Sequence, residues 1–382
     1  MSKPTLLVLG STFPKALGDG TPAFVLDLAI EQLKQFDVTV MVPMVPGAKR
    51  TEVISGVKVI RYRYWPFAHT LADGAILDNL KANPSNYLQV PLLLLALYRN
   101  IQKLKPKLVH AHWIIPQGII ATLAAPKAKL IVTTHGGDIY ALNSPLIKRL
   151  KIWVLQRASK VSTVNSQMKQ QLQAWGIAPE KIAVLPMGVD LQGAKSVVSK
   201  RKPNQLALVG RLVEKKGIEF LLEALRMGQG KLPQDLHLVI AGDGPSRKAL
   251  EAKAKGLPVT FLGKQTQVQV RQLFSESAIA LLPSVTAQSG DQEGLPVTML
   301  EAAAAGCCII ASDLPGINEV IRNRETGLLT EQGNADSILE ALITALGDPD
   351  LVAKCAKNVQ LEVARFDHAA VGASYNKLIG EA

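Results

Sequence analysis

The sequence LALVGRLVEKKGIEFLLEAL, residues 206–225, decides the fold class, because it reads as a strand, a turn and a helix in succession. Residues 206–209 form a short apolar run that is typical of a strand buried in a parallel sheet. The apolar residues that then recur at the spacing of one helix face are Ile218, Leu221, Leu222 and Leu225. Parallel strands need a crossover, usually a helix, so the stretch predicts one unit of an α/β domain.

The same alternation of strand and helix runs through most of the chain. In the first half, strands are expected at residues 5–9, 38–42, 57–62, 108–112, 130–134, 161–164 and 182–185, with 57–62 at a sheet edge. In the second half, they are expected at residues 206–209, 236–241, 259–262, 279–282 and 308–311. The predicted fold class is α/β, with two Rossmann-like doubly wound domains facing each other across a cleft.

A polar, basic and weakly patterned segment separates the two series of strands, which is typical of a linker. We expect an N-terminal domain over residues 1–190, a linker over 191–205 and a C-terminal domain over 206–364. Ligands of such sheets bind at the carboxyl ends of the strands. The residues that follow strand ends are therefore the first candidates for a functional site.

Composition limits the class of protein. A chain of 382 residues suits roughly two or three domains, and 48% hydrophobic with 19% charged residues is typical of a globular protein. No apolar run approaches the roughly 18 residues of a membrane-spanning helix, and MSKPTLLVLG predicts a first strand rather than a signal peptide. The three cysteines fit neither a disulfide framework nor a zinc pattern, so we expect reduced thiols in a cytoplasmic protein.

The net charge of +12 suggests an anionic partner. Basic residues cluster at 103–107, at 148–160 and at 195–202. No aromatic ladder accompanies them, which argues against a platform for single-stranded nucleic acid. Peripheral contact with the inner face of an anionic membrane and an ordinary solvated surface both remain open.

Two carboxylates eight residues apart mark the leading candidate site, in QEGLPVTMLEAAAAG. Glu293 is expected in a Gly-Pro loop, and Glu301 about one turn into a helix that Pro296 begins. A helix N-terminus attracts anions, and ionised carboxylates accept hydrogen bonds from sugar hydroxyls. The arrangement predicts a site for a sugar diphosphate.

Basic residues follow the first strand of the second domain. Gly210 and Arg211 end that strand, and Lys216 precedes the next helix. A guanidinium fork and an ammonium at a helix start can together bind a diphosphate. Lys215 is interpreted as a solvated neighbour, which is the ordinary state of a basic loop residue.

Histidines lie at two strand ends of the first domain. His135, in TTHGGD, is followed by two glycines that let a ligand approach closely, although a hydrogen-bonded structural histidine is the alternative. His110 and His112 share one strand face but have no evident third metal ligand, so structural or acceptor-side roles are favoured over a metal site.

Two further turns carry weaker signals. Gly20 lies in a glycine-containing turn before the first helix, where backbone can approach a ligand closely. The G-x-G-x-x-G pattern is incomplete there, so a dinucleotide site is not supported. The pair of acids around Pro349 resembles a metal motif, but Asp350 is better interpreted as a helix cap.

Taken together, these residues resemble the retaining glycosyltransferases of family 4, which have the GT-B fold. The resemblance covers nearly the whole chain. The segments that carry it are GDGTPAFVLDLA, HAHWIIPQG, TTHGGD, PMGVD, VGRLVEKKGIEFLLEA, IAGDGP, FLG, LLPS, EGLPVTMLEAAAAG and LPGINEVI. The E-x7-E element together with the Gly-Arg and Lys-Gly segments is specific as a set.

The resemblance implies roles for single residues. Glu293 would bind hydroxyls of the donor sugar near the backbone of Gly294 and Leu295, and Glu301 would hold the ribose. Arg211 and Lys216, beside Gly210, would neutralise the leaving diphosphate. Gly20 would bring backbone N–H to a phosphate, His135 would support charge at the anomeric centre, and backbone near Gly263 would read the base. Transfer with retention and without a metal or other cofactor is implied.

The resemblance also implies domain roles and partners. The first domain would bind the acceptor, the second the nucleotide sugar, and residues from about 365 to 382 would return to the first domain. A UDP- or GDP-sugar donor and a glycan, lipid-linked or small-molecule acceptor are expected, as in cell-envelope or exopolysaccharide biosynthesis. No nucleic-acid partner is expected.

Three departures from the family pattern concern the site. Asp19 replaces the first glycine of a Gly-Gly pair, Met187 stands where Asn is usual, and residues 286–292 lengthen the loop before Glu293. That insertion makes the identity of the sugar the least determined feature. Two rivals remain: a nucleotide-sugar epimerase or hydrolase of the same fold, and a basic protein that binds nucleic acid or membrane.

Overall fold

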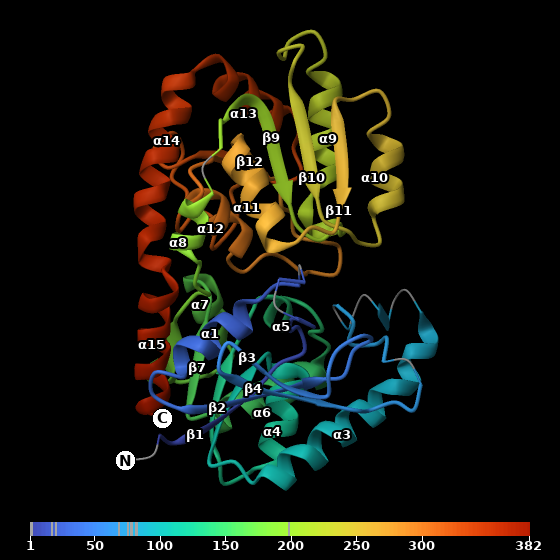
Figure 1. Cartoon of the computed structure of the whole chain (residues 1–382), viewed down its shortest axis with the longest axis vertical. Coiled ribbons are helices and arrows are strands. Elements are labelled where there is room, and N and C mark those ends of the chain that lie inside the picture. The colour runs from blue at the N-terminus through green and yellow to red at the C-terminus, as the bar shows by residue number, and fades with distance from the viewer. Residues whose placement is uncertain are drawn as a thin grey trace. The chain divides into compact units, whose positions relative to one another are not determined.

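The computed structural model in Figure 1 describes residues 3–16, 18–19, 21–67, 69–74, 76, 79–80, 83–197 and 199–382. The chain divides into two compact units. Unit 1 comprises Met1–Gly188 and His368–Ala382, and unit 2 comprises Val189–Asp367. Each unit has its own sheet and its own hydrophobic core, so the prediction of two Rossmann-like α/β domains is confirmed.

Unit 1 is built on an eight-stranded sheet in the order β3-β4-β2-β1-β5-β6-β7-β8. Its strands are β1 (Thr5–Leu9), β2 (Asp37–Pro43), β3 (Thr51–Ile54), β4 (Val57–Tyr62), β5 (Leu108–His112), β6 (Lys129–Thr133), β7 (Lys160–Thr163) and β8 (Ile182–Val184). Its helical segments are α1 (Phe24–Gln32), η1 (Pro84–Leu88), α3 (Gln89–Leu104), η2 (Ile114–Gly118), α4 (Ile119–Ala124), α5 (Gly137–Tyr140), α6 (Pro145–Arg157), α7 (Ser166–Ala174), η3 (Pro179–Lys181) and α15 (His368–Gly380).

The expected edge strand at 57–62 is not at the edge. An antiparallel strand, β3, pairs outside β4. Ser55 and Gly56 join the two strands, and both have positive φ, as a tight hairpin turn of the primed type requires. The turn residues were a usable signal, but β3 itself is too short and too exposed to stand out in the sequence.

The last helix, α15, packs against α1, and Figure 1 shows the red helix beside the blue one. Gly372 permits this approach, because a Cβ atom there would lie 2.4 Å from Glu31 Cβ. Asn376 Nδ2 donates to the Glu31 carbonyl oxygen at 3.1 Å, and the Tyr375 hydroxyl donates to the Leu185 carbonyl oxygen at 2.8 Å. Residues 368–382 are therefore fixed to unit 1 by packing and by hydrogen bonds.

Unit 2 is built on a six-stranded parallel sheet in the order β11-β10-β9-β12-β13-β14. Its strands are β9 (Lys202–Val209), β10 (His237–Ala241), β11 (Val259–Gly263), β12 (Ser277–Leu282), β13 (Cys308–Ser312) and β14 (Leu328–Thr330). Its helical segments are α8 (Leu191–Ser196), η4 (Glu214–Lys216), α9 (Ile218–Met227), α10 (Arg247–Lys253), α11 (Gln267–Glu276), α12 (Val297–Ala304), α13 (Ala335–Gly347), α14 (Pro349–Glu362) and η5 (Val363–Phe366).

The segment expected to be a linker, residues 191–205, contains regular structure instead. It forms α8 and the first part of β9. Asp190 caps α8 by accepting from the Gly193 N–H at 2.8 Å, and Arg201 donates to the Ala305 carbonyl oxygen at 2.7 Å. Both side chains bind backbone groups within unit 2. The polar residues that resembled a linker therefore cap a helix and hold the start of β9 in place.

Two smaller expectations also need correction, and one short strand was missed. Pro296 is the residue before α12 rather than its first residue, and its ψ of 116° is extended. Asp348 rather than Asp350 caps α14, because its side chain accepts from the Leu351 N–H at 2.9 Å. The three-residue strand β14 was not predicted, since so short a run has no readable period.

Both sheets have a point where the direction of strand addition reverses. In unit 1 this point lies between β1 and β5, and in unit 2 between β9 and β12. The loops after neighbouring strands then diverge at the carboxyl edge, which is where open α/β sheets bind ligands. Within unit 2 this points to the loops after β9 and β12, and within unit 1, taken by itself, to the loops after β1 and β5.

The remaining sequence expectations concern membranes and thiols. Within the described ranges, no helix has both the length and the apolar character needed to cross a bilayer. The three cysteines are buried and unbridged.

Candidate active site

Two loops of unit 2 touch at the switch point of its sheet. The loop after β9 covers residues 210–217, and the loop after β12 covers residues 283–296. The Val285 N–H donates to the Lys215 carbonyl oxygen at 2.9 Å. Gly217 has a φ of +59°, and a Cβ atom on it would lie 1.8 Å from the Pro283 carbonyl oxygen. Only glycine allows this backbone contact, which fixes one loop against the other.

The contact brings Lys216 and Glu293 together. Lys216 Nζ lies 3.0 Å from Glu293 Oε1, and the two side chains are only 14% and 12% exposed. Gly210 leaves room for the lysine, since a Cβ atom there would lie 3.0 Å from Lys216 Cε. Three residues singled out in the sequence, from two separate motifs, thus form one cluster.

The electrostatic balance of this cluster keeps the carboxylate ionised. Burial by itself raises the pKa of Glu293, but the Lys216 ammonium, and after it the Lys215 ammonium, outweigh burial and hold that pKa below its usual value. Above the usual range of a carboxyl pKa, Glu293 therefore carries its charge and accepts hydrogen bonds. A sugar hydroxyl is a suitable donor to such a group.

The inserted segment 286–292 is fixed to the same loops. Lys215 Nζ lies 3.1 Å from Asp291 Oδ2, so Lys215 is ion-paired rather than a solvated bystander. The Gln288 N–H donates to Glu214 Oε1 at 2.8 Å, and the Thr286 N–H donates to Gln332 Oε1 at 3.0 Å. Segment 286–292, which precedes Glu293, is therefore held in place by these contacts.

Glu301 lies inside α12, as the sequence predicted, and has a partner that sequence reasoning missed. Gln267 Nε2 donates to Glu301 Oε1 at 2.7 Å. Gln267 is the first residue of α11, whose start is fixed by a reciprocal capping box between Thr266 and Gln269. That capping box was readable in the sequence, but its proximity to Glu301 was not, because the two residues lie on different helices.

A shallow hollow adjoins this pair within unit 2. Its lining residues are Val189, Asp190, Ala194, Gln267, Val270, Arg271, Phe274, Glu301 and Ala305. Arg271 Nη2 lies 2.7 Å from Asp190 Oδ2, so this basic residue is already paired. The polar lining of the hollow consists of the hydrogen-bonded pair Gln267–Glu301 and the ion pair Arg271–Asp190, and the other lining residues are apolar.

The other predicted donor-site residues of unit 2 occupy the same edge of the sheet. Arg211 is half-buried in the loop after β9, and Gly263 ends β11 with a φ of +70°. A Cβ atom on Gly263 would lie 2.9 Å from Arg247 Nη1. Gly294 is buried and Leu295 half-buried in the turn before α12. Gly20, predicted from unit 1, lies outside the described residues.

His135 lies in unit 1, in an aromatic cluster after β6. Its ring centroid is 5.1 Å from that of Phe24, 4.6 Å from that of Trp113 and 5.3 Å from that of His112. His135 Nε2 is 3.1 Å from His112 Nδ1. Burial first, and the nearby His110 second, lower the pKa of His135 to about 3, so the ring is neutral at pH 7.

One buried carboxylate connects the loops of this cluster. Asp138 accepts from the His135 N–H at 2.9 Å and from the Ile114 N–H at 3.1 Å. It therefore ties the loop after β6 to the loop after β5. Burial raises the pKa of Asp138, against the opposing effect of these hydrogen bonds and of Lys151. Sequence reasoning did not single out Asp138, although it stands three residues after His135.

His110 lies deeper, in a chain of hydrogen bonds that crosses unit 1. Gln32 Nε2 is 3.0 Å from His110 Nδ1, and His110 Nε2 is 2.7 Å from Thr133 Oγ1. The chain continues from Thr133 Oγ1 to Ser162 Oγ at 2.7 Å, to the Tyr375 hydroxyl at 3.3 Å and to the Leu185 carbonyl. One direction satisfies every link, in which Gln32 donates to a neutral His110. Of the structural and acceptor-side roles predicted for His110, the structural one fits this network.

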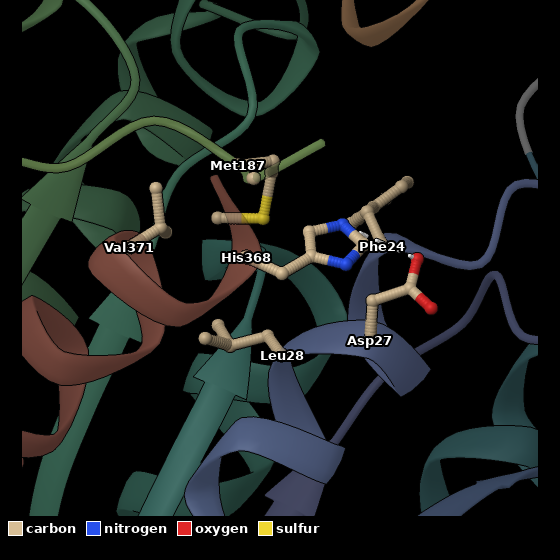
Figure 2. Close-up of a pocket in the computed structure, with 7 residues that line it drawn as sticks. Phe24, Asp27, Leu28, Met187, His368 and Val371 are labelled. Atoms are coloured by element: carbon tan, nitrogen blue, oxygen red, sulfur yellow. Dashed lines mark ion pairs between the residues drawn. The ribbon is translucent and has the colours of Figure 1, made fainter. Parts of the chain in front are cut away.

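Figure 2 shows a second shallow hollow, which lies within unit 1. Phe24, Asp27 and Leu28 of α1 face His368 and Val371 of α15, with Met187 beside them. His368 Nε2 lies 3.9 Å from Asp27 Oδ2. Met187, at the position where the resemblance leads one to expect Asn, thus lines a hollow of mixed polar and apolar character that also includes Phe24, whose ring packs against His135. Among the described residues, no three His, Cys, Asp or Glu side chains gather as metal ligands would.

The two halves of the chain match two families of known proteins. Residues 18–192 match the family described as Glycosyltransferase Family 4, and residues 193–362 match the family described as Glycosyl transferases group 1. The boundary between the two matches lies a few residues from the start of unit 2 at Val189.

Curated relatives carry the same kind of description. The amylovoran biosynthesis glycosyltransferase AmsK of Erwinia amylovora is 32% identical over 59% of this chain and 57% of AmsK. The α-1,3-galactosyltransferase of Escherichia coli, named for UDP-Gal and a GlcNAc-diphosphoundecaprenol, is 27% identical over 67% of this chain and 70% of its own length. The chain spans only 57% of AmsK and 58% of the putative colanic acid glycosyltransferase WcaL of Salmonella typhimurium.

Solved structures show the likeness of fold over the whole chain. Sucrose-phosphate synthase of Thermosynechococcus elongatus superposes with a TM-score of 0.77 at 18% identity, covering 98% of each chain. Anabaena HepE in complex with UDP and glucose superposes with a TM-score of 0.73 at 17% identity, covering 99% of this chain and 100% of HepE. The GT-B fold expected from the sequence is confirmed.

Proposed function

This chain belongs to the glycosyltransferases of family 4 and group 1, and from that premise we propose that it transfers a sugar, with retention, from a nucleoside-diphosphate sugar to a glycan, lipid-linked or small-molecule acceptor. The observation that carries the proposal is the Lys216–Glu293 ion pair of 3.0 Å, held at the switch point of unit 2. A parallel sheet places its ligand at that point.

The chemistry of unit 2 suits departure of a nucleoside diphosphate. Negative charge develops on the diphosphate as the bond to the sugar breaks, and preorganised cations stabilise it. Lys216 and Arg211 would supply this charge. Glu293, kept ionised by its lysine neighbours, would accept from sugar hydroxyls, and Glu301, oriented by Gln267, would accept from the ribose.

His135 has a separate proposed role in unit 1. A neutral imidazole accepts a hydrogen bond through one nitrogen and donates through the other. With a pKa of about 3, His135 would act as such a neutral partner of the transferred sugar rather than as a cation. We expect neither a metal ion nor a cofactor to take part.

Substrate classes follow from the relatives. HepE has been solved with UDP-glucose, and the Escherichia coli relative is named for UDP-Gal and a lipid diphosphate acceptor. We therefore expect a UDP-sugar donor first and a GDP-sugar second, with a role in cell-envelope or exopolysaccharide biosynthesis. A lipid-linked acceptor would be met at a membrane surface.

The first experiment is a thermal-shift screen of the purified chain against UDP-, GDP- and ADP-sugars without metal. One nucleotide class should raise the melting temperature, because a ligand that binds only the folded state stabilises it. Glu301→Ala should abolish the shift, and Gln267→Ala should weaken donor affinity roughly fivefold by releasing Glu301. Glu340→Ala, on the exposed side of α13, is the matched control and should retain the shift.

The reaction class is tested once a donor is known. The product's anomeric configuration, read by NMR, should match that of the donor, and an inverted product would overturn the retaining assignment. Donor consumption should require an acceptor. Rapid epimerisation or hydrolysis without an acceptor would favour the rival enzyme class.

A further inference from the structure

Three neighbouring helices of unit 1 expose leucine side chains to solvent. α3 packs against α4, and α4 packs against α6, so they form one layer, which Figure 1 shows in teal and green. The exposed leucines are Leu88, Leu92 and Leu95 at α3, Leu123 on α4, and Leu146 and Leu150 on α6. With the exposed Arg99, Lys103, Arg149 and Arg157, these residues are termed the basic leucine face.

The exposed leucines of α3 are not needed for its packing. Gln89, Leu93, Leu97 and Ile101 repeat every four residues and are the buried stripe of this helix. A second stripe, Leu88, Leu92, Leu95, Arg99 and Lys103, lies on the exposed side. A surface helix of a globular protein normally has charged residues on that side. An exposed apolar stripe that continues into basic residues indicates an interaction surface.

α6 repeats this design. Leu146 is 77% exposed, and Leu150 follows it one turn later. The half-buried Trp153 comes next, with the Arg157 guanidinium 4.5 Å from its ring centroid. Leucine, tryptophan and arginine on one face are the combination found in helices that lie in the plane of a membrane interface.

The charge of the protein is concentrated in the same part of the chain. Residues 79–179 contain 13 lysines and arginines but a single acidic residue, Asp138, which is buried. Their surplus of 12 positive charges equals the net charge of +12 of the whole chain, so the remaining residues are balanced. The helices with exposed leucines therefore lie in a segment without one exposed acid among its described residues.

We propose that the basic leucine face docks unit 1 on the surface of an anionic lipid bilayer. The leucines enter the boundary between headgroups and acyl chains, and the arginines and lysines bind lipid phosphates. A nucleic acid would use the basic residues but leave the leucines exposed. The proposal deepens the proposed function by naming the surface at which a lipid-linked acceptor is met.

The test is co-sedimentation of the full chain with vesicles, in the absence of any sugar donor. Binding to vesicles of phosphatidylcholine with phosphatidylglycerol should be at least about tenfold tighter than to phosphatidylcholine alone. The variant L92Q/L95Q/L146Q should lose about tenfold in affinity, because less apolar surface enters the membrane. The variant R99Q/K103Q/R149Q should lose a similar amount and most of the salt dependence.

Matched variants in unit 2 separate this surface from general charge and stickiness. K231Q/K255Q/K357Q removes three exposed lysines, and L361Q removes a leucine that is 69% exposed. Both should bind vesicles as the native chain does. Unchanged melting temperatures of all variants show that folding is intact, since the altered side chains are exposed.

Two results would overturn the proposal. One is equal affinity for neutral and anionic vesicles. The other is unchanged vesicle binding by the leucine variant, with RNA displacing the protein from vesicles, as expected of a nucleic-acid surface. Because no donor is present, either result leaves the proposed transferase activity standing, and failure of the donor screen leaves vesicle binding standing.

Discussion

Burial disfavours the charged form both of the histidines of unit 1 and of Glu293 of unit 2, yet Glu293 is charged and His110 is neutral. It lowers the pKa of His110 to about 3, and no opposing charge counters it, so the ring is neutral. It raises the pKa of Glu293, but Lys216 and Lys215 reverse the effect, so the carboxylate is charged. Both results follow from the cost of an unpaired buried charge.

The difference separates the kinds of work that the two regions can do. A neutral chain of hydrogen bonds fixes strands and α15 of unit 1 without any net charge. The Lys216 and Glu293 side chains are 14% and 12% exposed, so water screens their charges only weakly. These charges can therefore act strongly on a bound ligand. We therefore expect removal of the charge of Glu293 to affect catalysis, and protonation of the buried histidines of unit 1 to affect stability.

The largest effect is expected for Glu293→Gln. The substitution keeps the size of the side chain but removes its charge, and kcat/KM for transfer should fall roughly 100- to 1000-fold. Steady-state kinetics with the donor found in the screen measures it. Glu223→Gln, on the exposed side of α9, should keep native activity. Native turnover by Glu293→Gln would show that this cluster is not the active site.

Lys216→Met should lower the free energy of unfolding by about 3 kcal/mol at pH 7, because a buried carboxylate loses its nearest cation. Without Lys216, burial should raise the pKa of Glu293 above its usual value. The pH dependence of the free energy of unfolding should then reverse. In the native chain the ion pair stabilises the fold above the unfolded carboxyl pKa, and this stabilisation is lost on acidification. The variant instead loses stability as pH rises. Urea unfolding at several pH values tests this.

The neighbouring lysine is the matched control. Lys215 pairs with Asp291, with side chains 24% and 31% exposed. Lys215→Met should therefore cost no more than about 1 kcal/mol. Equal losses in the free energy of unfolding for the two variants would show that the difference in burial does not affect stability.

Acid should destabilise unit 1 through its histidines. Between about pH 6.5 and 3 the unfolded state binds a proton that folded His110 does not, so stability falls as pH falls through that window. At pH 5 the loss should be about 2 kcal/mol for this residue. Thermal unfolding of His110→Gln should show a shallower pH slope, whereas Tyr375→Phe, in the same network, should keep the native slope.

The smallest effect is expected at the end of that network. Tyr375→Phe removes the donor to the Leu185 carbonyl and should cost about 1 kcal/mol at neutral pH. Urea unfolding measures it. Tyr98→Phe, whose hydroxyl accepts from Gln102 near the surface, should cost less than about 0.5 kcal/mol. A similar cost for both tyrosines would argue against the buried chain as a support of α15.

Much of the fold could be read from apolar runs, because parallel strands are buried on both faces. β1 and β5 begin and end where their runs do, at Thr5–Leu9 and Leu108–His112. The errors fall where polar residues bind backbone, as at 191–205, or where a strand is short and exposed, as at β3. In both cases the signal depends on partners distant in the sequence.

The sequence by itself determined the fold class, the candidate residues at strand ends and the family resemblance, because local periodicity and motif spacing are properties of the chain. Only the tertiary structure decided which candidates act together. Lys216 meets Glu293, 77 residues away, since β9 and β12 are neighbours in the sheet. Gln267 reaches Glu301, and the leucines of α3, α4 and α6 share a layer, because packing sets distances that sequence separation does not encode.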